Sequence, residues 1–197
     1  MQIECRRLLA TTILLLPMVF ISTAMGQEEN AFQWVVFSDT PPQLAMASDG
    51  SKILIAGTGT FAVGEAKQVT GGGTWATFNA SGVATGSGNF RVTDLLKFDL
   101  APGSATGYPT FHAGLAFLHI VYDDGSKGIL VVSCSLNFFG PTTPLSVPEG
   151  FSASKGFVDY WKGFINGDTI FVAIPRKQDT NCTLRMSNRS RKVAACS

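Results

Sequence analysis

Apolar and polar side chains alternate along most of this chain. The clearest stretch is 52–63, where one side is formed by Ile53, Ile55, Gly57, Gly59, Phe61 and Val63, and the other by Lys52, Thr58 and Thr60. Because successive side chains of a β-strand point to opposite faces, a period of two predicts strands with one buried side. No stretch beyond residue 26 keeps the 3.6-residue apolar period of a helix, so we expect an all-β protein.

Turn signals divide the alternating segments into about eight or nine predicted strands. Two apolar strands, 112–122 and 127–138, flank Asp123-Asp124-Gly125-Ser126, which predicts a central β-hairpin. The others are expected at 32–38, 43–47, 52–63, 74–79, 90–100, 152–161 and 169–174. In 90–100 we expect a single buried face, formed by Phe90, Val92, Leu96, Phe98 and Leu100. This spacing predicts a single antiparallel β-barrel of about eight strands, with a β-sandwich as the alternative.

The first 26 residues have the order of a secretory signal peptide. Arg6 and Arg7 precede an apolar run from residue 8 to residue 21, and small residues lead to Gly26. This order predicts cleavage after Gly26 and a secreted, extracytoplasmic domain from 27 to 174. An uncleaved membrane anchor is the alternative, but the run is shorter than the ~20 residues that a spanning helix needs. We therefore expect no stable membrane span once the leader is removed.

The charge balance of the expected mature chain argues against nucleic acid as a partner. Removing Arg6, Arg7 and Glu4 from 15 basic and 14 acidic residues leaves 13 of each. Such a domain lacks the positive charge of a nucleic-acid-binding protein. The tail 175–197 differs, with six basic residues and a single acidic one, Asp179. We interpret it as a solvated basic tail, with an electrostatic contact to an acidic polysaccharide or a membrane surface as the alternative.

Three cysteines remain after the leader. Cys182 and Cys196 lie in the same polar tail, so they are the expected disulfide in an oxidising compartment. Cys134 lies in an apolar strand, where a lone thiol usually behaves as a small buried apolar group. No Cys-x-x-Cys or Cys/His cluster is present, so we expect neither a zinc site nor a cofactor.

Three titratable residues fall on strand faces that otherwise read as buried. Asp94, His119 and Asp159 are each in register with apolar neighbours. Burial of a carboxylate is costly unless it is paired, and an interior histidine between two carboxylates could act as a general acid or base. These residues are therefore candidate catalytic residues of a barrel isomerase or lyase. The alternative is structural, with the aspartates at a bulge or in solvent and a hydrogen-bonded histidine in the core.

Large aromatic residues offer a second kind of site. Trp34, Trp75, Tyr160 and Trp161 are candidates to line a cavity for a small apolar ligand. Barrels of about eight strands can hold one such ligand. The alternative is that these rings fill the core.

Two resemblances rest on short sequence stretches. The segment GTGTFAVGEAKQVTGGG (57–73) resembles the glycine-and-phenylalanine strands of dirigent and allene-oxide-cyclase barrels. The segments VTGGGTW (69–75), AGLAFLHIVYDDGSKGILVVSC (113–134) and EGFSASKGFVDYW (149–161) resemble small exported β proteins of unknown function. The resemblances imply one compact β domain. They transfer no catalytic residue, because no site motif of either barrel family is found.

These observations favour a secreted, non-catalytic binding or surface-interaction module. Its expected partner is a small apolar ligand or a surface polysaccharide. The enzyme described above is the competing interpretation, and a structural protein of an envelope or matrix, which self-associates through exposed strands, is a third.

Overall fold

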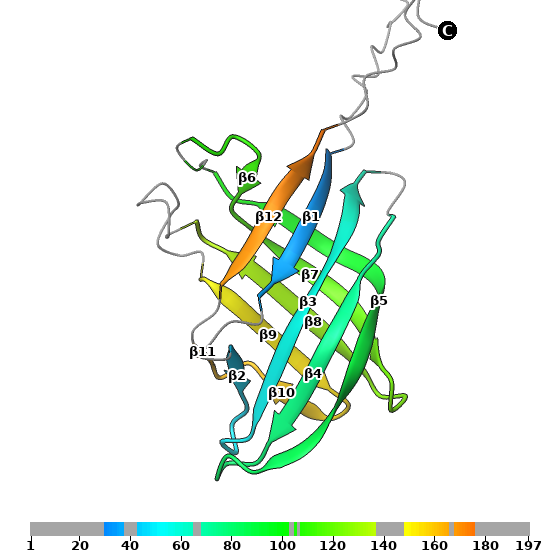
Figure 1. The fold of residues 1–197 in the computed structure, drawn as a ribbon, viewed down its shortest axis with the longest axis vertical. Coiled ribbons are helices and arrows are strands. Elements are labelled where there is room, and N and C mark those ends of the chain that lie inside the picture. Colours follow the sequence, from blue (N-terminus) through cyan, green and yellow to red (C-terminus); the bar gives the residue numbers. More distant parts are fainter. Residues whose placement is uncertain are drawn as a thin grey trace, which may run out of the picture.

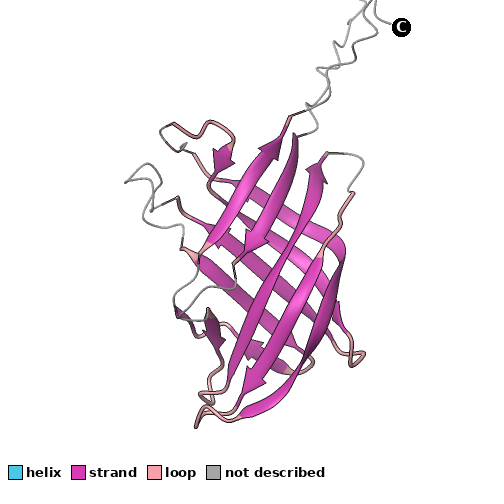
Figure 2. Cartoon of the chain, in the orientation of Figure 1, coloured by secondary structure: helices cyan, strands magenta, loops and turns pink. Residues whose placement is uncertain are grey.

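A computed structural model describes residues 30–37, 43–64, 68–102, 105, 107–136, 148–165 and 168–175. This part of the chain is all-β and contains no helix (Figure 2). Its strands are β1 (Asn30–Val36), β2 (Leu44–Met46), β3 (Lys52–Val63), β4 (Gly72–Phe78), β5 (Ala84–Leu100), β6 (Phe111–His112), β7 (Gly114–Tyr122), β8 (Lys127–Cys134), β9 (Gly150–Lys155), β10 (Val158–Tyr160), β11 (Gly163–Ile165) and β12 (Thr169–Ile174). The predicted all-β class is confirmed. The leader 1–26, the tail beyond residue 175 and the expected Cys182–Cys196 disulfide lie outside the described residues.

All the strands belong to one antiparallel sheet. Its hydrogen-bonded order is β10-β9-β8-β7-β5-β4-β3-β1-β12-β6, and β2 pairs with both β3 and β11. The central part, from β3 to β9, is a meander in which each strand pairs with the next one along the chain, except that β5 pairs with β7 because the short β6 pairs with β12 instead. The predicted hairpin is present, since β7 and β8 pair along their length from Gly114↔Cys134 to Val121↔Lys127.

The sheet curls so that one half covers the other. Figure 1 shows β12, β1, β3 and β4 crossing in front of β7, β8 and β9. The long strand β5 bends along one side and pairs with both β4 and β7, so it connects the two layers. The buried side chains lie between the layers and form one apolar core.

The hydrogen-bonded ladder does not close into a barrel. It ends at β10 on one side and at β6 on the other, and in the described chain no strand pairing joins β12 to β8 or β9. Glu149 bridges this gap instead: its carboxylate accepts hydrogen bonds from Ser135 N (2.7 Å), Ser135 Oγ (2.8 Å) and Thr169 N (2.9 Å). Thr169 Oγ1 lies 2.5 Å from the carbonyl oxygen of Ser133. We call this contact between β8 and β12 the seam.

Aromatic rings fill the centre of the core. The rings of Phe32, Phe61, Phe98 and Phe171 pack against one another, with centroid separations from 4.8 Å for Phe32–Phe98 to 6.1 Å for Phe61–Phe171. Tilted and edge-on rings at such distances are favourable arrangements of aromatic pairs. The space between the layers here is therefore occupied by side chains.

Two irregularities in β5 change which of its residues face the core. The pairing with β7 shifts between Val92 and Asp94 and again between Leu95 and Lys97. Each extra residue reverses the alternation of faces, so the buried side chains of this stretch are Phe90, Val92 and Leu95. The prediction of a single buried face was wrong for Leu96 and Leu100, which are exposed.

Candidate functional site

The three titratable residues singled out from the sequence lie on the outside of the sheet. Asp94, His119 and Asp159 are all exposed, so the expectation that they are interior residues was wrong. For Asp94 the cause is the first shift in β5, which moves it to the face opposite Val92. His119 does share a face with Phe117 and Val121, but that face is the outer one. The inner face of β7 carries Ala116, Leu118 and Ile120.

The same three residues nevertheless lie on one row across the sheet. Asp94 is the register partner of His119, and His119 is the partner of Ile129. Ile129 N donates to Ser154 Oγ (2.9 Å), and Ser154 is the partner of Asp159. With neighbouring strands about 4.8 Å apart, the two aspartates are separated by roughly 19 Å. In the described structure no hydrogen bond or ion pair joins His119 to either of them.

An open groove of about 600 Å³ lies on this outer face. Its walls come from four strands and from the turn after β9, and they are formed by Arg91, Thr93, His119, Ile120, Val121, Lys127, Gly128, Ile129, Ser154 and Gly156. A volume of this size is typical of sites for small molecules or for short segments of a polymer. The groove, which we call the outer groove, is the candidate functional site.

Small residues keep the outer groove hollow. Gly156 has no side chain, and Ser154 directs its hydroxyl to the backbone of β8. Gly128 contributes only its backbone, because it is the register partner of the inward-facing Ile120. At Gly128 the backbones also approach closely, because a Cβ there would lie 1.8 Å from the carbonyl oxygen of Ser154. Any larger residue at 128 would therefore push β9 away from β8.

Positive charge is concentrated in the outer groove. Arg91 and Lys127 are exposed, both line the groove, and neither forms an ion pair with any residue that the structure describes. They are on one row, because Arg91 is the register partner of Val121 and Val121 is the partner of Lys127. His119 lies on the adjacent outer row and adds an imidazole. The arrangement suits a ligand that carries negative charge, since free cationic side chains form charge-assisted hydrogen bonds with carboxylates and related anions.

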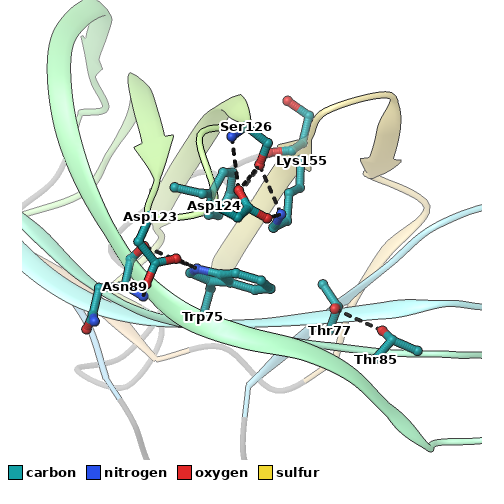
Figure 3. Close-up of polar contacts among 10 residues, drawn as sticks. Trp75, Thr77, Thr85, Asn89, Asp123, Asp124, Ser126 and Lys155 are labelled. Carbon is teal, nitrogen blue, oxygen red and sulfur yellow. Dashed lines mark hydrogen bonds and ion pairs between the residues drawn. The ribbon is translucent and has the colours of Figure 1, made fainter.

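A network of polar contacts fixes the end of the groove (Figure 3). In the β7–β8 turn, Asp124 Oδ1 accepts from Ser126 N (2.9 Å) and Ser126 Oγ (2.7 Å). Lys155 at the end of β9 forms an ion pair with Asp124 and donates to Ser126 Oγ (2.9 Å). Its Nζ also lies 4.2 Å from the centroid of the Trp75 ring. The sequence predicted the turn between β7 and β8, but it did not predict that Lys155 would bind Asp124 in that turn.

Asp123 connects the same turn to β4 and β5. Its Oδ2 accepts from Asn89 N (2.7 Å), and its Oδ1 lies 3.1 Å from Trp75 Nε1, as Figure 3 shows. The hydrogen bond from Asn89 is the largest cause that lowers the pKa of Asp123. The hydrogen bond from Lys155, followed by those from Ser126, lowers the pKa of Asp124 to about 2. Both carboxylates are therefore ionised at neutral pH and hold the turn in place.

The aromatic candidates divide between core and surface. Trp34, Trp75 and Tyr160 are buried, whereas Trp161 is half exposed. Trp75 packs edge-on against Tyr122 at 5.6 Å, and Trp34 Nε1 is buried without a hydrogen-bond partner among the described residues. The three buried rings belong to the apolar core. A cavity lined by these aromatic residues remains a prediction that these contacts do not support.

The remaining expectations concern cysteine, metals and membranes. Cys134 is buried and free, and burial is the main cause that raises its thiol pKa to about 12. In the described ranges, no group of three or more His, Cys, Asp or Glu side chains is placed to hold a metal ion. The same ranges contain no helix that is long and apolar enough to cross a membrane.

Comparison with known proteins returned no relative: no family model, curated protein or solved structure matches this chain. The resemblance to dirigent and allene-oxide-cyclase barrels therefore stays a prediction. The functional argument rests on the geometry of the outer groove.

Proposed function

We propose that this protein is a secreted, non-catalytic binding module, and that its outer groove binds an acidic polysaccharide. One observation carries the proposal: Arg91, His119 and Lys127 line the same open groove, and neither the guanidinium nor the ammonium group has an ion-pair partner in the described chain. Secretion is proposed from the leader 1–26.

Two properties of the groove favour a polymer over a small apolar ligand. It is open to solvent on the outside of the sheet, so it does not need to enclose the whole ligand. The interior, where an apolar ligand would bind, is filled by packed rings such as those of Phe61 and Phe98. The tail 175–197 would add six basic residues to the same electrostatic attraction.

The proposal is tested by measuring binding to a soluble polyuronate at two salt concentrations. The double variant Arg91→Gln/Lys127→Gln should weaken binding by about 100-fold or more, because each of the two charged hydrogen bonds contributes about 1.5 kcal/mol or more. The control Lys97→Gln removes an exposed cation from the outside of β5, away from the groove, and should leave affinity unchanged. Equal effects of both changes, or binding that salt does not weaken, would contradict the proposal.

The competing enzyme hypothesis has one supporting observation, the register pairing of Asp94 with His119 beside the groove. Against it, both side chains are exposed and make no hydrogen bond to each other in the described structure. We therefore expect His119→Ala to reduce polyuronate affinity, and we expect neither the wild type nor this variant to turn over a polyuronate. The third hypothesis, a self-associating matrix protein, is disfavoured because the strands at the two ends of the ladder, β10 and β6, are only three and two residues long.

A further inference from the structure

Phe157 is the most exposed large apolar residue of the described chain. Its relative exposure is 108%, so none of the described residues covers the ring. It lies in the tight turn between β9 and β10, where Lys155 pairs with Val158. Gly156 adopts a positive φ of 60°, a conformation that glycine tolerates without strain.

The turn places the backbone of Phe157 beside the outer groove. Gly156 N donates to the carbonyl oxygen of Lys127 (3.0 Å), and both residues line the groove. On the other side of the turn, Lys155 is fixed by its contacts with Asp124 and Ser126. Phe157 therefore follows directly after Gly156, a residue of the groove wall, and its phenyl ring is free to contact a ligand there.

We infer that Phe157 is an aromatic platform on which a sugar ring of the ligand stacks, and that the ligand is a polyuronate, a polymer whose pyranose rings carry carboxylates. This inference rests on the proposed function. The C–H face of a pyranose is apolar and covers an aromatic face, while the ring carboxylate reaches Lys127 and Arg91. A site that combines a ring with cations distinguishes a polyuronate from an uncharged polysaccharide, which lacks the anion.

The concave shape of the outer groove favours a polysaccharide over an anionic lipid surface as the ligand. A bilayer surface is flat and meets a broad basic face, whereas here the cations line a groove of about 600 Å³. A single polymer chain can enter such a groove, whereas a bilayer surface cannot follow its concave shape.

The test compares four binding partners: polygalacturonate, its neutral methyl ester, dextran sulfate, and vesicles of phosphatidylcholine with phosphatidylserine. Each is titrated against protein purified after expression of the whole 197-residue chain. Phe157→Ala should weaken polygalacturonate binding by about tenfold, which matches the ~1.5 kcal/mol of a stacked ring. Phe157→Trp should retain or increase affinity. The control Val83→Ala changes another exposed apolar residue, at the β4–β5 turn, and should leave affinity within about twofold.

The outcomes separate this inference from the proposed function. Both the stacking platform and the polyanion site are supported if Phe157→Ala loses polygalacturonate binding, Phe157→Trp restores it, and the neutral methyl ester binds weakly. If polygalacturonate and dextran sulfate bind equally well without Phe157, the ring is not a stacking platform. The proposed function, binding of a polyanion in the outer groove, would then still stand. Absence of binding to either polyanion overturns the proposed function itself. If the protein binds the vesicles through Phe157 and does not bind polygalacturonate, the ring contacts a membrane surface. That result would overturn the proposal that the ligand is a polyuronate.

Discussion

The Nζ atom of Lys155 lies 4.2 Å from the centroid of the Trp75 ring, on strands that are far apart in the sequence. The same ammonium group lies 4.9 Å from the Tyr122 ring centroid and is ion-paired with Asp124. Its side chain is only 14% exposed. Lys155 thus covers one end of the apolar core and at the same time fixes the turn that carries Phe157.

Replacement of Lys155 by methionine should destabilise the fold by about 2 kcal/mol, since it removes a shielded cation–π contact and leaves Asp124 without its cation. Urea unfolding followed by tryptophan fluorescence measures the change. Lys97→Met, at a lysine that is 64% exposed, is the matched control and should cost less than about 0.5 kcal/mol. Equal stabilities of the two variants would contradict the role given to Lys155.

The stability that Asp124 contributes should depend on pH. Its pKa is about 2 in the folded protein, below the ordinary value of about 3.9 for an unfolded aspartate. As the pH falls, the unfolded state binds the proton first, so the contribution is complete above about pH 5 and is lost as the pH falls through 2. The difference in unfolding midpoint between wild type and Asp124→Asn should therefore shrink between pH 5 and pH 2. A difference that stays constant over this range would refute the ion-pair assignment.

Glu149→Ala should destabilise the protein by about 3 kcal/mol, because three donors on Ser135 and Thr169 lose their acceptor. Hydrogen exchange gives a sharper readout than stability alone. The amides of Ser135 and Thr169 should lose protection, while that of Ile120 in the β7–β8 pair should change only by the global loss of stability. Asp99→Ala, at an exposed surface ion pair, serves as control. Unchanged exchange at Thr169 would show that Glu149 does not hold the seam.

Gly128→Ala should separate β9 from β8, because the new Cβ would meet the Ser154 carbonyl oxygen at 1.8 Å. We expect a loss of about 2 kcal/mol or more, together with weakened polyuronate binding. Gly125→Asn is the control, since nothing lies within 4 Å of that position and asparagine tolerates its positive φ of 84°. Wild-type stability of Gly128→Ala would mean that β9 does not approach β8 so closely.

Cys134 should resist thiol reagents in the folded protein. Its thiol is buried and its pKa is raised to about 12, so almost no thiolate is available at pH 8. In a Cys182→Ser/Cys196→Ser background, labelling should occur only at the rate of unfolding and become rapid in urea. Rapid labelling of the native protein would show that the core around Cys134 opens locally.

The alternation of side chains predicted the fold class and most strands because period two depends only on local sequence. It failed where pairing adds a residue: the shifts in β5 turned Leu96 and Asp94 outward, and nothing within 90–100 announces them. The β7–β8 hairpin was predictable from its Asp-Asp-Gly-Ser turn. An apolar strand also does not reveal which of its faces is the inner one, and His119 was misplaced for that reason.

The outer groove could not be predicted from the sequence. Arg91, His119 and Lys127 come from three different strands, and only the register of β5 with β7 and of β7 with β8 brings them together. The sequence pattern predicted one continuous strand, 152–161, that includes Phe157, whereas the chain turns sharply at Gly156. Its exposure follows from that turn.

The seam has a consequence for how this fold can change during evolution. Elsewhere in the ladder, neighbouring strands are joined by backbone hydrogen bonds, which almost any residue can supply. Where β8 meets β12, side chains make the contact instead, through the carboxylate of Glu149 and the hydroxyl of Thr169. Substitutions at these two codons can therefore loosen one layer from the other without changing any strand pair.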